Sequence, residues 1–204
     1  MYSNKTLVEA MRRVGYASEE VASAMLEVDR KDFLERGQRE YAYFDTPLPI
    51  GYSQTTSAPS IVARMLSLLE IKRGMNVLEV GVGSGYQTAL VAKLVGEKGS
   101  VTGVEIVPQL VKYAKDNLEK YKLKNIKLVR GSGAHGYKEG APYDRIVYSA
   151  AVKSVPQQAV EQLKDGGRLI APVGDVYQTL HLVQRKDGSL ETTELDLVVF
   201  VPLL

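Results

Sequence analysis

The chain alternates between stretches in which apolar residues recur every three or four positions and short runs of consecutive apolar residues. The first pattern is typical of amphipathic helices, and the second is typical of strands buried in a parallel sheet. Alternation of this kind indicates an α/β fold with a doubly wound, mostly parallel sheet and helices on both faces. The pattern predicts helices over about 60–70, 86–95, 108–121 and 156–163, and strands over 76–80, 100–105, 126–130, 144–149 and 167–173.

The amino-terminal part departs from this alternation. Apolar spacing predicts two helices over 5–14 and 18–29, and Ser18 is the expected N-cap of the second. Residues 40–59 read as an irregular segment rich in aromatic residues and turn formers. A loop of that length inside a compact domain is usually functional.

The carboxy-terminal part predicts an antiparallel hairpin, because two strand-like segments, 178–185 and 190–201, flank a turn over 186–189. A chain of 204 residues with this content of apolar residues can bury one substantial core. We therefore expect a single domain over 1–204, built from a helical cap with a substrate-side loop (1–59), a cofactor-binding core (60–174) and the terminal hairpin (175–204).

The most distinctive segment follows the first strand of the predicted core, where Glu79 is followed by three alternating glycines, Gly81, Gly83 and Gly85. A strand-to-helix turn that presents backbone N–H groups to a ligand needs positive φ angles and no obstructing Cβ atoms. Glu105 closes the next strand, where a carboxylate can accept both hydroxyls of a ribose. Together these residues predict a site for an adenosine-containing cofactor.

The spacing of the motif, E-x-G-x-G-x-G, differs from the G-x-G-x-x-G fingerprint of nicotinamide cofactors. It resembles motif I of class I S-adenosylmethionine-dependent methyltransferases, which have a Rossmann-like fold. In those enzymes the strand-end acid lies near the methionine amino group, and the glycine loop packs against the methionine and ribose. The pattern alone leaves two alternatives, an NAD-dependent dehydrogenase and a glycine-rich turn without a ligand.

Composition narrows the chemistry. The chain has no cysteine, which excludes disulfides, thiolate nucleophiles and Cys-ligated metals, and its two separated histidines, His135 and His181, form no recognisable metal-ligand set. A net charge of +2 is too balanced to imply nucleic acid or an anionic membrane as an obligatory partner. No apolar run reaches the roughly 18 residues of a membrane span, and no hydrophobic signal core is present. We expect a cytoplasmic enzyme and leave its oligomeric state open.

Several further segments share one family pattern. The most specific are Q-T-T-S-A-P at 54–59 and V-P-L at 201–203, and the others are E-I-V-P-Q-L-V at 105–111, A-P-Y-D-R-I-V at 141–147 and the stretch 161–174. Together they resemble the protein-L-isoaspartate (D-aspartate) O-methyltransferase family over nearly the whole chain. The resemblance implies transfer of a methyl group from S-adenosylmethionine to the free carboxylate of isoaspartyl and D-aspartyl residues in damaged proteins.

The resemblance also implies roles for individual residues. The family's active-site serine corresponds to Ser57, which would orient the acceptor carboxylate. A carboxylate with a pKa near 4 is already ionised at neutral pH and needs no general base. Ser57 is also a good N-cap candidate for the helix that follows it; we favour the functional role, and the two roles are compatible. The residues expected to hold the cofactor are Glu79, Gly81, Gly83, Gly85, Glu105, Ile106 and Ser132.

Two positions differ from the usual family pattern. Ser132 stands where the family usually has an aspartate that reaches the adenine amino group, and Ser60 stands where it often has a histidine. A hydroxyl can still accept the adenine hydrogen bond, but without charge, so we expect cofactor binding to be weaker by about 1 kcal/mol. Two alternatives stay open: a related methyltransferase acting on RNA or a small molecule, and a cofactor-binding protein that has lost isoaspartyl activity.

Overall fold

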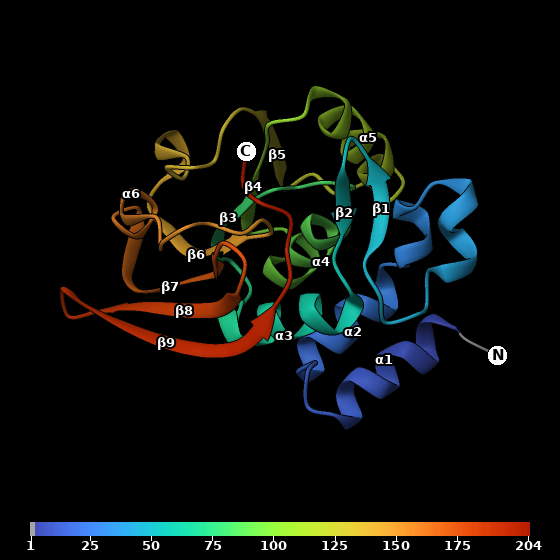
Figure 1. Ribbon diagram of the computed structural model, residues 1–204, viewed down its shortest axis with the longest axis horizontal. Coiled ribbons are helices and arrows are strands. Elements are labelled where there is room, and N and C mark those ends of the chain that lie inside the picture. Colours follow the sequence, from blue (N-terminus) through green and yellow to red (C-terminus); the bar gives the residue numbers. More distant parts are fainter. Residues whose placement is uncertain (1–2) are drawn as a thin grey trace.

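The computed structural model describes residues 3–204 and is built around a mixed sheet of seven strands (Figure 1). The strands lie in the order β5-β4-β3-β6-β7-β8-β9; β3 to β7 run parallel, and β8 and β9 are antiparallel to their neighbours. This arrangement confirms the Rossmann-like fold class and the terminal hairpin. The strands are β3 (Asn76–Val80), β4 (Ser100–Glu105), β5 (Ile126–Arg130), β6 (Tyr143–Tyr148), β7 (Leu163–Gly174), β8 (Gln178–Lys186) and β9 (Ser189–Val198).

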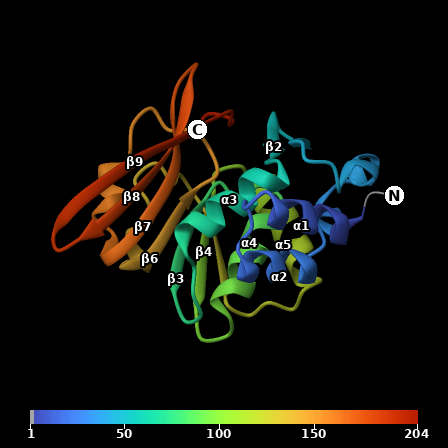
Figure 2. The same ribbon diagram turned by 90° about the horizontal axis from the view of Figure 1, so that it is seen from below.

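The helices cover the two faces of the sheet unequally, as Figure 2 shows. Five of them pack on one face, where fully buried side chains such as Leu66, Leu90 and Ile170 join helix and sheet into one apolar cluster. Burial of each such side chain stabilises the fold by about 1.5–3 kcal/mol. These helices are α1 (Asn4–Arg13), α2 (Glu19–Glu27), α3 (Pro59–Leu69), α4 (Tyr86–Val95) and α5 (Pro108–Glu119).

The opposite face carries much less helix. A single turn, α6 (Gln157–Val160), and the 3₁₀ turn η3 (Lys138–Gly140) pack there. The helix expected over 156–163 was therefore too long and the strand expected over 167–173 too short. Leu163 already pairs with Tyr143 in the sheet, and a bulge follows before regular pairing resumes at Arg168.

The amino-terminal helices begin as expected. The Ser18 hydroxyl accepts a hydrogen bond from the backbone N of Val21 (3.3 Å), which confirms it as the N-cap of α2.

Within residues 3–204, no helix is long and apolar enough to cross a lipid bilayer.

The segment expected to be irregular over 40–59 contains a small hairpin, β1 (Leu48–Gly51) and β2 (Gln54–Thr56). Two 3₁₀ turns precede it, η1 (Arg30–Phe33) and η2 (Arg36–Tyr41). The hairpin turn places Tyr52 and Ser53 at φ values of 54° and 57°. Such turns strongly favour Gly, Asn or Asp, so these two residues gave no hairpin signal in the sequence.

Candidate functional site

The glycine loop joins the carboxyl end of β3 to α4 and has the backbone that its sequence predicts. Gly81, Gly83 and Gly85 adopt φ values of 87°, 56° and 89°. A Cβ atom at Gly81 would lie 3.5 Å from the carbonyl carbon of Ser149, and one at Gly83 would lie 3.0 Å from Cδ1 of Ile50. The loop therefore leaves a narrow space between β3, the end of β6 and the β1–β2 hairpin, in which backbone atoms are accessible.

Glu79 lies at the base of this space with a fully buried side chain. Nε2 of Gln87 donates hydrogen bonds to Oε1 of Glu79 (3.1 Å) and to Oγ of Ser149 (2.7 Å). Oε2 of Glu79 is buried and has no hydrogen-bond partner among the described residues, although the Thr88 hydroxyl, which also has none, lies near the carboxylate and favours its ionised form. Burial raises the pKa of Glu79 to about 8, because the charged form loses its hydration. A ligand that brings a cation or N–H donor to this oxygen would complete its hydrogen bonding and favour the ionised form.

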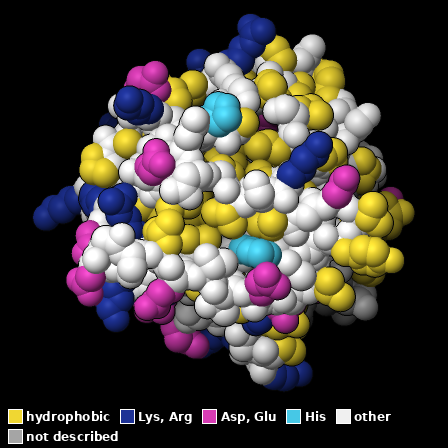
Figure 3. Space-filling view, turned by 60° about the vertical axis from the view of Figure 1, so that its left-hand side comes forward, with side chains coloured by type: hydrophobic (Ala, Val, Ile, Leu, Met, Phe, Trp, Pro, Cys, Tyr) yellow, Lys and Arg dark blue, Asp and Glu magenta, His cyan; other side chains and the backbone are white. Residues whose placement is uncertain are grey.

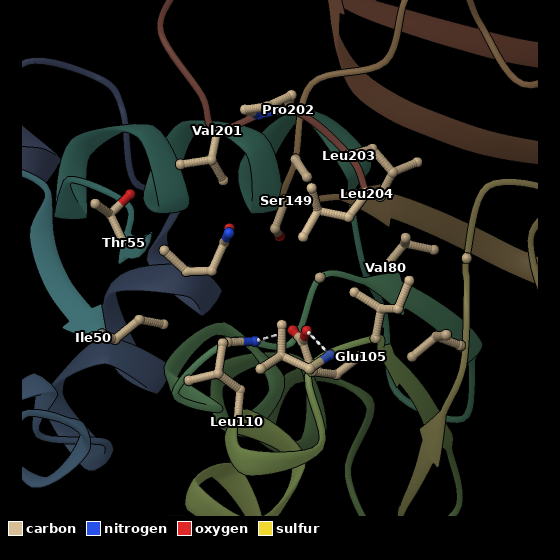
Figure 4. Close-up of a pocket in the computed structure, with 18 of the residues that line it drawn as sticks. Ile50, Thr55, Val80, Glu105, Leu110, Ser149, Val201, Pro202, Leu203 and Leu204 are labelled. Atoms are coloured by element: carbon tan, nitrogen blue, oxygen red, sulfur yellow. Dashed lines mark hydrogen bonds between the residues drawn. The ribbon is translucent and has the colours of Figure 1, made fainter. Parts of the chain in front are cut away.

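Glu105 holds the glycine loop against the end of β4. Its Oε2 accepts a hydrogen bond from the backbone N of Gly83 (2.9 Å), and its Oε1 accepts one from the backbone N of Val107 (2.9 Å), as Figure 4 shows. Each carboxylate oxygen can accept a second hydrogen bond. Glu105 can therefore fix the loop and still receive the hydroxyls of a ribose.

Two adjoining cavities follow the carboxyl edge of the sheet. They share Thr55, Gly81, Gly83 and Ser149, and their volumes are about 50 and 30 Å³. The first is bordered by Glu105 and Ile106, and by side chains of the hairpin and the carboxy terminus that face each other across it (Figure 4). The second is bordered by Ser57, Glu79 and Gln87. The structure thus brings together Ser57, Glu79, Gly81, Gly83, Glu105 and Ile106 from the set expected from the sequence.

The other two residues of that set are not among those that border the two cavities. Gly85 borders neither cavity, and a Cβ atom there would lie 3.3 Å from Cβ of Ala114 and Cγ of Leu118, so this glycine permits close packing of the loop on α5. Ser132 lines an open groove of about 890 Å³ that shares Val104 and Gly131 with the first cavity. Its Oγ accepts a long hydrogen bond of 3.4 Å from the backbone N of Ala134.

The helix-cap interpretation of Ser57 was wrong. The N-cap residue of α3 is Ala58, and no side-chain cap is made there. Instead, Oδ1 of Asp45 accepts a hydrogen bond from the backbone N of Ser60 (2.9 Å), one of the two residues that depart from the family pattern. The Ser57 hydroxyl is therefore not needed at the start of the helix.

The sequence reasoning missed the carboxy-terminal segment as part of the site. Val201 to Leu204 border the first cavity and cross above it (Figure 4). The backbone N of Ala151 donates to the carbonyl of Val201 (2.8 Å), and the backbone N of Leu203 donates to the carbonyl of Ala151 (2.8 Å). The V-P-L match was the signal that could have pointed to this role. Gln87 and Ser149 were also missed.

The histidines take no part in these cavities. His135 lines the groove beside Ser132, and Nε2 of His181 lies 2.9 Å from Oγ1 of Thr179. Figure 3 shows the two histidines apart on a face where basic and acidic side chains are interspersed. Within the described residues, no group of three or more His, Cys, Asp or Glu side chains is arranged to hold a metal ion.

Comparisons with known proteins agree with this geometry. The model of the family "Protein-L-isoaspartate(D-aspartate) O-methyltransferase (PCMT)" matches residues 2–204. A protein-L-isoaspartate O-methyltransferase of Methanothrix thermoacetophila is 46% identical over 97% of this chain and 93% of its own. A solved protein-L-isoaspartate O-methyltransferase structure aligns with a TM-score of 0.90 at 33% identity. The alignment covers 98% of this chain and 65% of the solved one, slightly under two thirds of its length. A Plasmodium falciparum protein assigned to the same activity, solved with S-adenosyl-L-homocysteine, aligns with a TM-score of 0.89 at 28% identity over 100% of this chain and 99% of its own.

Proposed function

The chain belongs to the protein-L-isoaspartate(D-aspartate) O-methyltransferase family, and we propose that it methylates the free carboxylate of isoaspartyl residues at the paired cavities, with Ser57 against the acceptor. The reaction uses S-adenosylmethionine and acts on isoaspartyl and D-aspartyl residues of damaged proteins. The observation that carries the residue assignment is that Ser57, from the acceptor-side loop, and Glu79, from the cofactor-side strand, border one cavity.

The residues around the glycine loop fit the cofactor. The partnerless Oε2 of Glu79 is a buried acceptor suited to the methionine amino group. Gly81 and Gly83 leave the backbone exposed at positive φ angles, and at Gly83 an added Cβ would also press against Cδ1 of Ile50. Glu105 has acceptor capacity left for ribose hydroxyls, and Ile106 offers a partly exposed apolar surface beside it. We further assign Gly85 to the support of this loop and Ser132 to the adenine end.

When bound, the cofactor supplies a methyl group activated by its positively charged sulfur. The protein itself must hold the acceptor oxygen in line with that methyl group and keep water away, and such positioning supplies several kcal/mol of the barrier reduction. Apolar side chains of Ile50, Val201 and Leu203 border the first cavity, which adjoins the one at Ser57, and provide an apolar surface beside this step. No protein base is required, because the acceptor is a carboxylate that is ionised at neutral pH.

Ser57 is suited to fix the acceptor. Its hydroxyl can donate one hydrogen bond to a carboxylate oxygen, and bonds to charged groups are worth about 1.5–3 kcal/mol. The residue lies at the end of the hairpin, partly exposed, where a polypeptide can reach it from solvent.

A labelling assay tests this function. The protein is incubated with methyl-labelled S-adenosylmethionine and either an isoaspartyl peptide or the same peptide with a normal aspartyl residue. We expect base-labile label in the isoaspartyl peptide alone. Equal labelling of the two peptides would contradict the proposed specificity, and labelling of RNA in place of either peptide would show a different acceptor.

A further inference from the structure

Arg30 is fully buried beneath the segment that carries Ser57. Its Nη1 donates hydrogen bonds to the carbonyl oxygens of Ala42 (3.1 Å) and Phe44 (3.2 Å). Its Nη2 donates to the carbonyl oxygens of Thr46 (2.8 Å) and Ser57 (3.2 Å). One guanidinium group therefore gathers four backbone carbonyls from both ends of the segment 42–57.

The Arg30 cation has no acidic partner at close range: within the described part of the chain, no ion pair shorter than 4.0 Å includes it. Burial lowers the pKa of Arg30 to about 10, so the group stays protonated at neutral pH. Burying a cation is costly. Here the four carbonyls offset that cost together with a favourable coulombic interaction with Asp45, which does not approach closely enough to form an ion pair. The planar guanidinium suits this task, because its five N–H donors point in fixed directions, whereas a lysine offers three donors from one atom.

The backbone beside Arg30 is fixed to the cofactor-binding core. The backbone N of Asp29 donates a hydrogen bond to Oη of Tyr121 (2.9 Å), and that hydroxyl donates to Oδ2 of Asp32 (2.8 Å). The rings of Phe33 and Tyr121 stack with centroids 5.5 Å apart. Tyr121 follows α5, the helix on which the glycine loop packs at Gly85. Arg30 thus connects the cofactor-side core to the acceptor-side segment.

We propose that Arg30 is a positioning residue for methyl transfer, which fixes the backbone at Ser57 so that its hydroxyl meets the acceptor carboxylate. Asp45 assists it, because its bond to the backbone N of Ser60 fastens the same segment to α3. The assignment rests on the proposed role of Ser57. Since misplacement by about 1 Å can cost a hundredfold in rate, loss of the four carbonyl bonds acts on catalysis without any contact between Arg30 and the substrate.

A double-mutant cycle tests this role. We expect Arg30→Lys to lower kcat/KM for an isoaspartyl peptide about ten- to hundredfold, with the Kd for S-adenosylhomocysteine within about twofold of the original. In a Ser57→Ala background, Arg30→Lys should lower kcat/KM by less than about twofold further, because no hydroxyl remains to be positioned. Additive losses in the double mutant, or an unchanged rate for Arg30→Lys alone, would overturn the proposal.

Arg145 provides a matched control. It is also buried, and its guanidinium donates to backbone carbonyls of Leu69, Glu70 and Gly166, but it lies in the first half of β6, away from both cavities. Arg145→Lys should lower the unfolding midpoint and leave kcat/KM of the folded protein unchanged. An equal loss of kcat/KM in Arg145→Lys would overturn a specific role for Arg30.

A second variant covers the case in which Arg30→Lys does not fold. Asp45→Ala leaves Arg30 in place but releases the same segment from α3. As a single substitution it should lower kcat/KM, and in the Ser57→Ala background it should cause little further loss of kcat/KM. The failures are distinguishable. If Ser57→Ala keeps full activity, the role proposed for Ser57 is wrong, and the positioning role of Arg30 is wrong with it. If Ser57→Ala is slow but the losses from Arg30→Lys or Asp45→Ala add to it in full, only the positioning role is contradicted.

Discussion

Gln87 and Glu79 form a buried pair in which Nε2 of Gln87 donates to Oε1 of Glu79 over 3.1 Å. The bond ties the first turn of α4 to the end of β3, and it leaves the second carboxylate oxygen without a hydrogen-bond partner among the described residues. The carboxyl group is therefore held in place but incompletely hydrogen-bonded. The protonation of Glu79 should therefore depend on whether a ligand occupies the second oxygen, and in the free protein the carboxyl group should keep its proton to a higher pH than an exposed glutamate.

Replacing Glu79 with Gln should change how stability depends on pH. The pKa of Glu79 is about 8 in the folded protein and close to 4.5 when unfolded. Between these values the folded state keeps a proton that the unfolded state loses, so this group lowers the free energy of unfolding as pH rises, by at most about 1.4 kcal/mol per pH unit. The stability of Glu79→Gln relative to the original protein should therefore rise from pH 5 to 8 and level off above.

Urea denaturation of both proteins at each pH measures this difference, and other titrating groups cancel because they are common to both. A difference that stays constant from pH 5 to 9 would mean that Glu79 ionises in the free protein with an ordinary pKa.

Ser57→Ala should slow methyl transfer with little effect on cofactor binding. Loss of a hydrogen bond to a charged acceptor costs about 1.5–3 kcal/mol, equivalent to roughly ten- to hundredfold in kcat/KM. Ser53→Ala, in the exposed turn of the same hairpin, is the matched control and should keep its activity. Steady-state kinetics with an isoaspartyl peptide, together with calorimetry of S-adenosylhomocysteine binding, separate the two effects; equal rates for both variants would remove Ser57 from the reaction.

Gly83→Ala should destabilise the protein and weaken cofactor binding. The φ of 56° costs a residue with a Cβ about 1–2 kcal/mol, and that Cβ would meet Cδ1 of Ile50 at 3.0 Å. Gly15→Ala isolates the first cost, because its φ is 75° and no atom lies within 4 Å of the added Cβ. The loss of stability in Gly83→Ala beyond that in Gly15→Ala is measured by thermal unfolding, and adding Ile50→Val, which removes Cδ1, should recover this difference. Equal losses of stability in Gly83→Ala and Gly15→Ala would show that the hairpin shifts to accommodate the added Cβ.

Ser132→Asp should tighten cofactor binding by about 1 kcal/mol, or roughly fivefold, if residue 132 reaches the adenine amino group. Ser132→Ala should weaken binding in the same assay. Because Ser132 lines the outer groove, calorimetry decides its role directly: unchanged affinity in both variants would leave the residue outside the cofactor site.

The sequence predicted those parts of the site that depend on local backbone requirements. Gly81 and Gly83 have the positive φ angles that their spacing implied, and Glu79 and Glu105 lie at the ends of adjacent parallel strands as expected. The function of Gly85 in packing against Ala114 and Leu118 was not readable, because it depends on which helix lies behind the loop.

The role of Arg30 and the length of α6 depend on tertiary contacts that the sequence pattern does not indicate. Arg30 binds backbone carbonyls, and a carbonyl is present at every residue, so no side-chain pattern identifies its partners. The length of α6 was overestimated because the apolar spacing over 156–163 fits a helix. In the structure the helix ends at Val160, and Leu163 pairs with Tyr143 in the sheet.

The strand-like pairing of Val201 and Leu203 with Ala151 has a practical consequence for handling the protein. Leu204 borders the first cavity, whereas α1 lies well away from it in Figure 1. An affinity tag fused after Leu204 would therefore lie next to the first cavity. Purification handles and immobilisation linkers therefore belong at the amino terminus when activity is to be compared between variants.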